Sequence, residues 1–199
     1  MKPAALLLGL ILLLGIGEFY APALEYDRAA IVQGEYWRLL TCHLTHVNNT
    51  HLFLNLGGTL LLFFLFGARH TWRQWLLATL LIMVGVGGAL LLFNPEVAWY
   101  RGLSGLLHGL LLMGIIGELK RGDPIYLLAA GLLFLKVAAE QFSAPFSPHT
   151  IDIPVIAASH LYGLVGGVVT ASFLARSAKR ASGECARSPE QRVHDSTPQ

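Results

Sequence analysis

Charged residues are scarce in this sequence. Lys, Arg, Asp and Glu make up 13% of its 199 residues, about half of the roughly 25% found in soluble domains. The 14 basic and 12 acidic residues nearly cancel, so the chain has no charge excess that would attract nucleic acid. Cysteine is also rare, with two residues, and internal repeats are absent. These features exclude a disulfide scaffold, a solenoid and a nucleic-acid-binding domain.

Apolar residues take the place of the missing charges. They make up 54% of the chain and gather in runs about long enough to cross the ~30 Å hydrocarbon core of a bilayer. We expect six membrane-spanning helices, at residues 4–16 (extended by Phe19 and Tyr20), 51–66, 75–93, 103–117, 125–139 and 154–174. The predicted fold is an all-α membrane protein, with a six-helix domain over residues 1–176 and a polar, disordered cytoplasmic tail over residues 177–199.

The first apolar run has a second interpretation. Met1 and Lys2, followed by a leucine run, also fit a secretory signal peptide. A cleavage site of small residues does not follow cleanly, the nearest candidate being residues 15–18. We therefore expect a retained helix.

The basic residues indicate how the helices are oriented, because cytoplasmic loops carry the excess of Lys and Arg. In a six-span arrangement, most basic residues fall on one side: Lys2, Arg69, Arg73, Lys120, Arg121, Arg176, Lys179, Arg180, Arg187 and Arg192. The opposite side holds only Arg28, Arg38 and Arg101. Both termini are thus expected in the cytoplasm, which leaves Cys42 outside and Cys185 inside, unable to pair.

The longest connection, residues 18–50, lies on the outer side in this arrangement. It carries aromatic and aliphatic residues at positions 36, 37, 39 and 40. Side chains of this kind settle at the boundary between lipid headgroups and acyl chains. They predict a short helix in the outer interface.

Polar residues inside membrane spans are expensive, so each one is a candidate for function. His51 and Asn55 lie in the first turns of the second span, entered from outside. Ser104 opens the fourth span, and His160 lies one to two turns into the sixth. Three helices thus bring these four residues to a similar depth, just below the outer surface.

The residue types at this level fit nucleophilic catalysis. A serine becomes a nucleophile when a neighbouring histidine takes its proton. The oxyanion that then forms needs donors, which His or Asn side chains and the free N–H groups at a helix start supply. Gly102 and Gly105 flank Ser104 and allow another backbone to come close. Beyond His160, a small-xxx-small pattern of glycines predicts tight contact between the fourth and sixth spans.

Other roles for the histidines stay open at this point. His108 is a rival base, but it lies one turn deeper on the same helix as Ser104 and points away from water. Haem or metal ligation by His43, His46, His51, His108 and His160 is a further alternative. No pair of these has bis-histidine spacing on facing spans and no carboxylate joins them, so no metal or cofactor is expected.

Two charged residues lie within the fifth span. Lys136 and Glu140 are four residues apart, so they can pair on one face of a helix and lower the cost of both charges in lipid. The pair is either structural or places Glu140 against the active-site cavity or the substrate. No acidic third member of a catalytic triad is expected, since Asp152 lies in a loop well outside.

Several motifs together resemble the rhomboid intramembrane serine proteases. They are EYWRLLTCHLTHVNNTHLFLNL (35–56), GLSG (102–105) and SHLYGLVGG (159–167), in the order and spacing of that family over most of the chain. The resemblance implies a six-helix fold, with Ser104 as nucleophile, His160 as base, and His51 and Asn55 as the oxyanion pair. It also implies that Trp37 and Arg38 form the loop motif and His46 a structural loop histidine.

The sequence departs from the usual rhomboid pattern in three places. His108 stands where an aromatic residue normally stacks on the base, the acidic residue near the end of the second span is absent around Gly67, and the stretch KVAAEQFSAP (136–145) is unusual. These features are similar to the rhombosortase subgroup. That likeness implies substrates anchored by a C-terminal Gly-Gly, a transmembrane helix and a basic cluster.

The expected function is therefore a serine endopeptidase in a bacterial inner membrane, with its active site facing the periplasm and tail-anchored exported proteins as partners. Gly102, His108, Lys136 and Glu140 are expected to support the site. A general rhomboid protease acting on other single-span substrates is the nearest alternative. A non-proteolytic rhomboid-like protein that binds transmembrane helices is another, although the presence of both Ser104 and His160 argues against it. A small transporter or redox protein using the histidines is the third.

Overall fold

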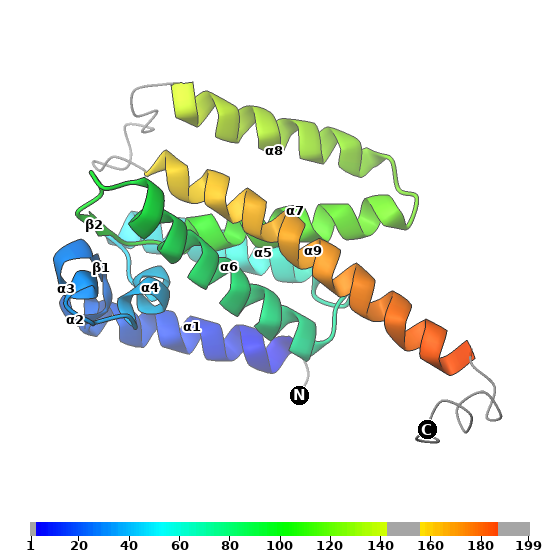
Figure 1. Ribbon diagram of the computed structural model, residues 1–199, viewed down its shortest axis with the longest axis horizontal. Helices are drawn as coiled ribbons and strands as arrows, with labels where there is room; N and C mark the ends of the chain where they lie inside the picture. Colours follow the sequence, from blue (N-terminus) through cyan, green and yellow to red (C-terminus); the bar gives the residue numbers. More distant parts are fainter. Residues whose placement is uncertain (1–2, 143–155, 187–199) are drawn as a thin grey trace, which may run out of the picture.

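The computed structural model describes residues 3–142 and 156–186. Long helices run roughly side by side and end at two opposite ends of the molecule (Figure 1). They are α1 (Pro3–Phe19), α5 (Asn49–Phe66), α6 (Trp72–Phe93), α7 (Ser104–Lys120), α8 (Ile125–Phe142) and α9 (Ala157–Ala186). Each covers most of one of the six apolar runs.

Among the described residues, four helices are long and apolar enough to cross a membrane: α5, α6, α8 and the part of α9 over Ala157–Ser177. The apolar part of α1, Leu7–Phe19, is shorter, and α7 has 17 residues. The protein is thus a multi-pass, all-α membrane protein. Whether α1 and α7 also cross the bilayer stays a prediction.

Helix α9 differs from expectation at its C-terminal end. It continues to Ala186, whereas disorder was expected from residue 177. The added segment SAKRASGECA contains three alanines, a lysine and an arginine, which are strong helix formers. An established helix also extends more easily than a new one begins, because each further residue adds one hydrogen bond.

Large apolar side chains cover the outside of the bundle. On α5, Phe53 and Phe64 are 66% and 84% exposed, and on α8 Leu128 and Leu135 are 61% and 67% exposed. In water such surfaces would drive association. In a bilayer they face acyl chains, which explains why α8 is so apolar and yet so little buried.

One end of the bundle, at the left of Figure 1, is covered by short elements. Between α1 and α5 these are α2 (Ala21–Leu24), β1 (Tyr26–Asp27), α3 (Arg28–Val32), α4 (Arg38–Thr41) and the 3-10 turn η1 (Cys42–Leu44). Strand β1 pairs antiparallel with β2 (Trp99–Tyr100), which comes just before α7. The predicted short helix around residues 36–40 is present as α4.

Arg38 links several parts of the segment between α1 and α5. Its guanidinium donates to the carbonyl oxygens of Pro22 and Glu25 at 3.0 and 2.9 Å and pairs with Glu35 at 2.6 Å. The side chain is 10% exposed, so these contacts satisfy a charge that would otherwise be buried without partners. The loop therefore forms a fixed cap over the ends of the helices.

Helix α7 lies in the centre of the bundle and contacts α5, α6, α8 and α9. Its contact with α9 is made by glycines on both helices. A Cβ atom at Gly163 would collide with the carbonyl group of Gly105, and one at Gly167 with that of Gly109. Only glycine permits backbones to come this close, so the predicted tight contact between these two helices is confirmed.

Candidate active site

Ser104 begins α7 at the capped end of the bundle. Just before it, Gly102 has a φ of +142°, a conformation that favours glycine. A Cβ atom at Gly102 would lie 2.8 Å from Cε1 of His51. The glycine therefore allows both the turn into α7 and the close approach of the His51 ring. At Gly105 the close neighbour is backbone, as expected, since a Cβ atom there would lie 2.8 Å from the Ser159 carbonyl oxygen.

His160 reaches Ser104 from α9, 56 residues further along the chain. Its Nε2 lies 2.9 Å from Ser104 Oγ, and its side chain is 5% exposed. The glycine contact between α7 and α9 brings the two helices close enough for this hydrogen bond. The structure thus brings the predicted nucleophile and base together.

His51 and Asn55 lie one turn apart on α5 and face the same cavity as Ser104. The Nδ2 of Asn55 and the Nδ1 of His51 are buried without a hydrogen-bond partner in the described part of the chain. A buried donor without a partner costs about 1–3 kcal/mol, so such groups call for an explanation. Both side chains line the cavity and are candidates to meet a ligand there.

The cavity has a volume of about 910 Å³. Residues of α5 form one wall, and residues of α7, α8, α9 and the segment 96–101 before α7 form the others. Apolar side chains make up most of the lining, with Leu54, Leu61 and Leu111 among them. A few polar groups in an apolar hollow are typical of a binding or active site.

The loop histidines have structural contacts. The ring nitrogens of His43 lie 3.2 and 3.1 Å from the carbonyl oxygens of Gly102 and Met83. Burial lowers the pKa of His43 to about 4, so the ring is neutral and donates a hydrogen bond to one of these two carbonyl oxygens. His46 lies 2.7 Å from a carboxylate oxygen of Glu18, and its ring meets the ring of His51 edge-on at 5.1 Å.

His108 stacks on His160 and does not contact the hydroxyl of Ser104. The two ring centroids are 4.1 Å apart and the planes differ by 16°. The Nδ1 of His108 lies 2.7 Å from the carbonyl oxygen of Ser104, while Nε2 lies 2.9 Å from Nζ of Lys136. His108 thus occupies the place of the stacking aromatic residue, and both its nitrogens are engaged elsewhere.

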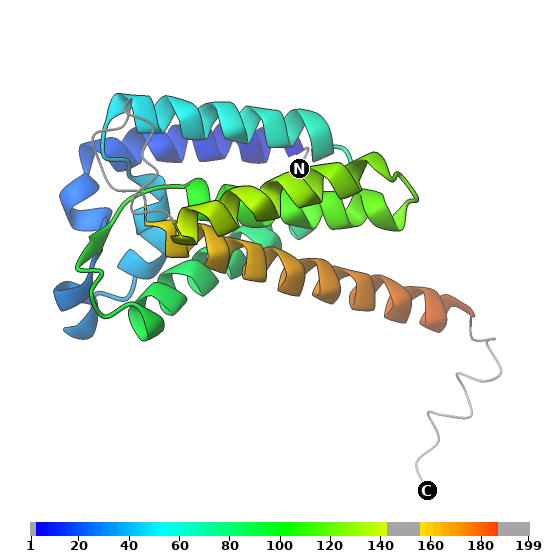
Figure 2. The same ribbon diagram turned by 90° about the horizontal axis from the view of Figure 1, so that it is seen from above.

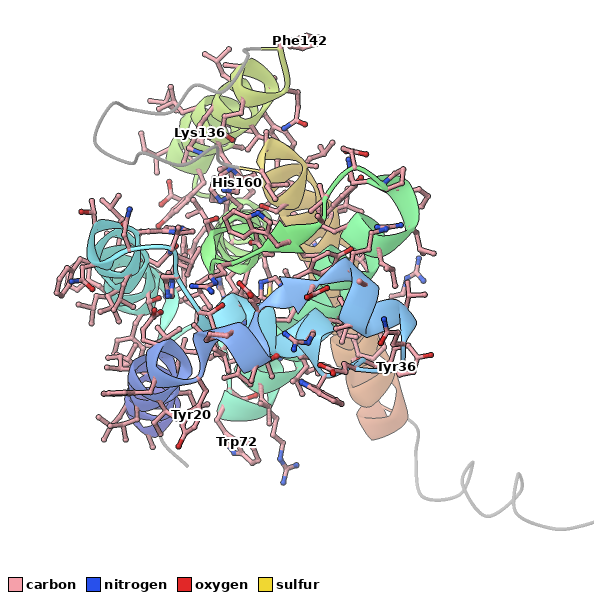
Figure 3. All side chains as sticks on the ribbon, turned by 90° about the vertical axis from the view of Figure 1, so that its left-hand side faces the viewer. Tyr20, Tyr36, Trp72, Lys136, Phe142 and His160 are labelled. Atoms are coloured by element: carbon pink, nitrogen blue, oxygen red, sulfur yellow. The ribbon has the colours of Figure 1, made fainter. Side chains whose placement is uncertain are left out.

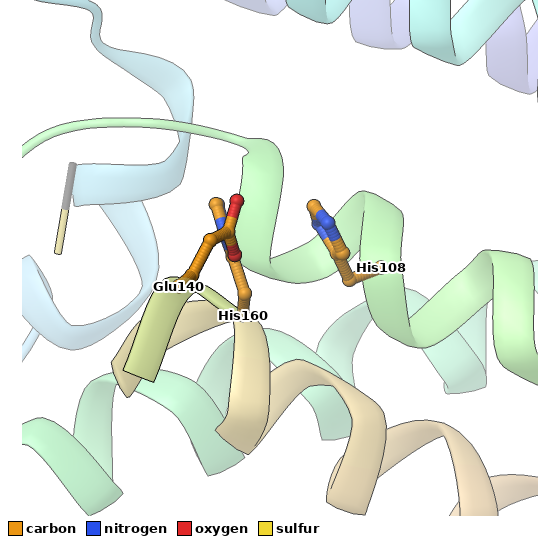
Figure 4. Close-up of side chains that lie close together, drawn as sticks. All are labelled: His108, Glu140 and His160. Atoms are coloured by element: carbon orange, nitrogen blue, oxygen red, sulfur yellow. The ribbon is translucent and has the colours of Figure 1, made fainter. Parts of the chain in front are cut away.

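The carboxylate of Glu140 lies beside the stacked rings of His108 and His160. Oε2 of Glu140 lies 2.7 Å from Nδ1 of His160. Figure 3 shows Lys136 of α8 near His160, and Figure 4 shows Glu140, His160 and His108 together. The sequence interpretation that no carboxylate lies beside these histidines is therefore wrong. The alternative that placed Glu140 against the active-site cavity agrees with the structure, in which Glu140 lines that cavity, while Asp152 falls outside the described residues.

His108, Glu140 and His160 bring one possible ligand atom each to within 4.8 Å of one another. The arrangement nevertheless does not suit a metal ion. The ammonium group of Lys136 contacts both His108 and Glu140, and a positive charge there opposes a divalent cation. The stacked rings also direct their lone pairs along parallel planes, so these do not converge on one point.

The family model for the Rhomboid domain matches residues 33–177, well over half of the chain. The chain belongs to the rhomboid family. No curated relative matches it. Rhomboids are a family of intramembrane proteases that act on substrates embedded in the bilayer. The match extends from residue 33, within the loop between α1 and α5, to the end of the apolar part of α9, and so includes every candidate residue described above.

One departure from the family pattern has a buried carboxylate nearby in this rhomboid chain. The acidic residue expected near the end of the second span is absent around Gly67, but Glu118 of α7 comes close to the same place. Its carboxylate lies 2.9 Å from Arg69 and 3.1 Å from Arg121, and its side chain is 5% exposed. The ion pairs connect the α5–α6 turn to the end of α7, far from Ser104.

Proposed function

We propose that the protein is an intramembrane serine endopeptidase in which Ser104 is the nucleophile and His160 the general base. The observation that carries this proposal is the 2.9 Å separation of Ser104 Oγ and His160 Nε2 at the wall of a large, mostly apolar cavity. Membership of the rhomboid family supports the same activity.

The reaction follows from these contacts. Ser104 Oγ attacks the carbonyl carbon of the scissile bond as its proton passes to Nε2 of His160. The C–N bond then breaks, and the imidazolium returns the proton to the leaving nitrogen. Water, activated by the same imidazole, hydrolyses the acyl-enzyme and regenerates Ser104.

His51 and Asn55 are the proposed oxyanion donors. The negative charge develops on the former carbonyl oxygen, and preorganised donors stabilise it most strongly in a site that excludes bulk water. The free backbone N–H groups in the first turn of α7 add to these side chains.

The substrate we propose is a C-terminal tail with Gly-Gly, an apolar helix and a basic cluster, as the likeness to rhombosortases implies. A helix in lipid has all its backbone groups hydrogen-bonded and offers no carbonyl to Ser104. Glycine eases unwinding by about 1 kcal/mol per residue relative to alanine. With both termini in the cytoplasm and Ser104 facing the periplasm, the substrate has its folded domain outside and its basic end inside.

A tailed reporter tests the choice of substrate. Its Gly-Gly is replaced by Leu-Leu, and the size and release of the reporter are followed in cells with wild-type protein or Ser104→Ala. We expect release only with the glycines and only with Ser104 present. Equal processing of both reporters, still dependent on Ser104, would refute the sorting role and leave a general rhomboid protease.

A further inference from the structure

Glu140 uses both of its carboxylate oxygens in the site. Oε1 accepts from Nζ of Lys136 at 2.6 Å, and Oε2 lies 2.7 Å from Nδ1 of His160. The Glu140 side chain is 16% exposed. A purely structural i,i+4 pair needs only the first contact, so the second calls for another reason.

The contact with Glu140 sets which nitrogen of His160 carries the proton. An ionised carboxylate only accepts hydrogen bonds, so Nδ1 must be the protonated nitrogen of the neutral ring. The lone pair is then on Nε2, which faces the hydroxyl of Ser104 at 2.9 Å. This is the tautomer and ring orientation that a base for Ser104 requires.

Lys136 fixes His108 in the same way. An ammonium group only donates, so Nε2 of His108 must accept from Lys136 at 2.9 Å. Nδ1 therefore carries the hydrogen and donates to the carbonyl oxygen of Ser104 at 2.7 Å. His108 is neutral, and the imidazolium of His160 stacks on an uncharged ring when it forms.

We propose that Glu140 is a positioning residue that completes a Ser104–His160–Glu140 triad. In this triad, Lys136 holds the carboxylate in place and keeps His108 neutral. This inference rests on the proposed protease function. During acylation the proton moves from Ser104 Oγ to Nε2 of His160 and later to the leaving nitrogen. Glu140 stays ionised throughout and stabilises the imidazolium between these transfers.

The first test replaces Glu140 with glutamine, which keeps the size and removes the charge. We expect kcat to fall on the order of 10²–10⁴-fold, with KM little changed, because the wrong tautomer of His160 becomes accessible. Glu140→Asp, which keeps the carboxylate, is expected to recover part of the loss. Cleavage is measured with purified protein, and a thermal unfolding curve is recorded for each variant.

Glu118→Gln is the matched control. It also removes a carboxylate paired with basic side chains on a membrane helix, but at the other end of α7. We expect it to lower the unfolding temperature and to leave the kcat of the folded fraction near the wild-type value. A purely structural role for Glu140 would give its variants the same behaviour as this control.

The double variant Lys136→Met/Glu140→Gln keeps the test decisive if Glu140→Gln does not fold, because it leaves no unpaired charge in the membrane. We expect it to fold and to show the same large loss of kcat. A folded double variant with wild-type kcat would overturn the positioning role of Glu140 while leaving the protease proposal intact. Cleavage that persists in Ser104→Ala would instead refute the protease proposal itself.

Discussion

At the scale of single residues, the histidines beside Ser104 have their hydrogen-bond partners in place before substrate binds. His160 has a contact on each ring nitrogen, and so has His108. His51 and Asn55 are different, because each keeps one buried ring or amide nitrogen without a partner in the described residues. The oxyanion role proposed for His51 and Asn55 would pair these nitrogens with the substrate.

The oxyanion role proposed for His51 and Asn55 gives a kinetic prediction. Asn55→Ala should lower kcat by about 10²–10³-fold with KM little changed, because it removes a donor that acts on the oxyanion. His51→Ala should have an equal or larger effect. Both are measured by steady-state cleavage with purified protein.

Thr59→Val is the control for these variants. Thr59 lies one turn below Asn55 on α5, and its hydroxyl donates to the backbone oxygen of Asn55 at 2.8 Å rather than into the active-site cavity. We expect its kcat to be close to that of wild type. Wild-type kinetics in Asn55→Ala and His51→Ala would remove both residues from the mechanism.

At the scale of elements, the contact between α7 and α9 sets the position of Ser104 relative to His160. Gly163→Ala would place a methyl group against the Gly105 carbonyl, and such overpacking costs about 1–3 kcal/mol. We expect a lower unfolding temperature together with a lower kcat, since the helices must separate. Both are measured on detergent-purified protein.

Gly85→Ala is the matched control on α6, because a Cβ atom there meets nothing within 4 Å. Alanine is favoured over glycine in a helix by about 1 kcal/mol, so this variant should be as stable as wild type or more so. If Gly163→Ala matches it in stability and activity, the close approach of α7 and α9 is not what positions the site.

The elements also show what the sequence could predict. Each long helix follows an apolar run, because lipid requires about 20 apolar residues per crossing, and the glycine pattern predicted which two helices touch. The motifs led to Ser104, His160, His51 and Asn55 as candidates. The contact between Glu140 and His160 depends on how α8 is rotated about its axis, which hydropathy does not determine.

A signal for Glu140 was nevertheless present. In the six-span arrangement the fifth span ends outside, so Glu140 near its outer end falls at about the depth of His160 near the start of the sixth. Ser104 and His160 are grouped because they lie at a similar depth in the membrane, and the same argument applies to Glu140. This reasoning favours the alternative that placed Glu140 against the active-site cavity over a purely structural pair with Lys136.

At the scale of the whole molecule, a loop cap, a tightly packed pair of helices and a sparsely packed α8 surround one cavity. Figure 1 shows α8 on one side of the bundle, and Figure 2, seen from above, shows it running over α7 and beside α9. The cap is bound to the turn before Ser104 through the hydrogen bond from the Gly102 N–H to the Cys42 carbonyl oxygen and through the pairing of β1 with β2. Ser104 and His160 thus lie on the tightly packed pair of helices, whereas Lys136 and Glu140 lie on the sparsely packed α8.

The most direct test of the central claim is cleavage of a Gly-Gly-tailed reporter by purified protein in liposomes. Wild type, Ser104→Ala, His160→Ala and the double variant are compared, with unfolding temperatures as the control for folding. We predict that each single variant loses cleavage and that the double variant loses little more, because a nucleophile and its base act as a unit. Wild-type cleavage by Ser104→Ala, or full activity in His160→Ala, would contradict the account.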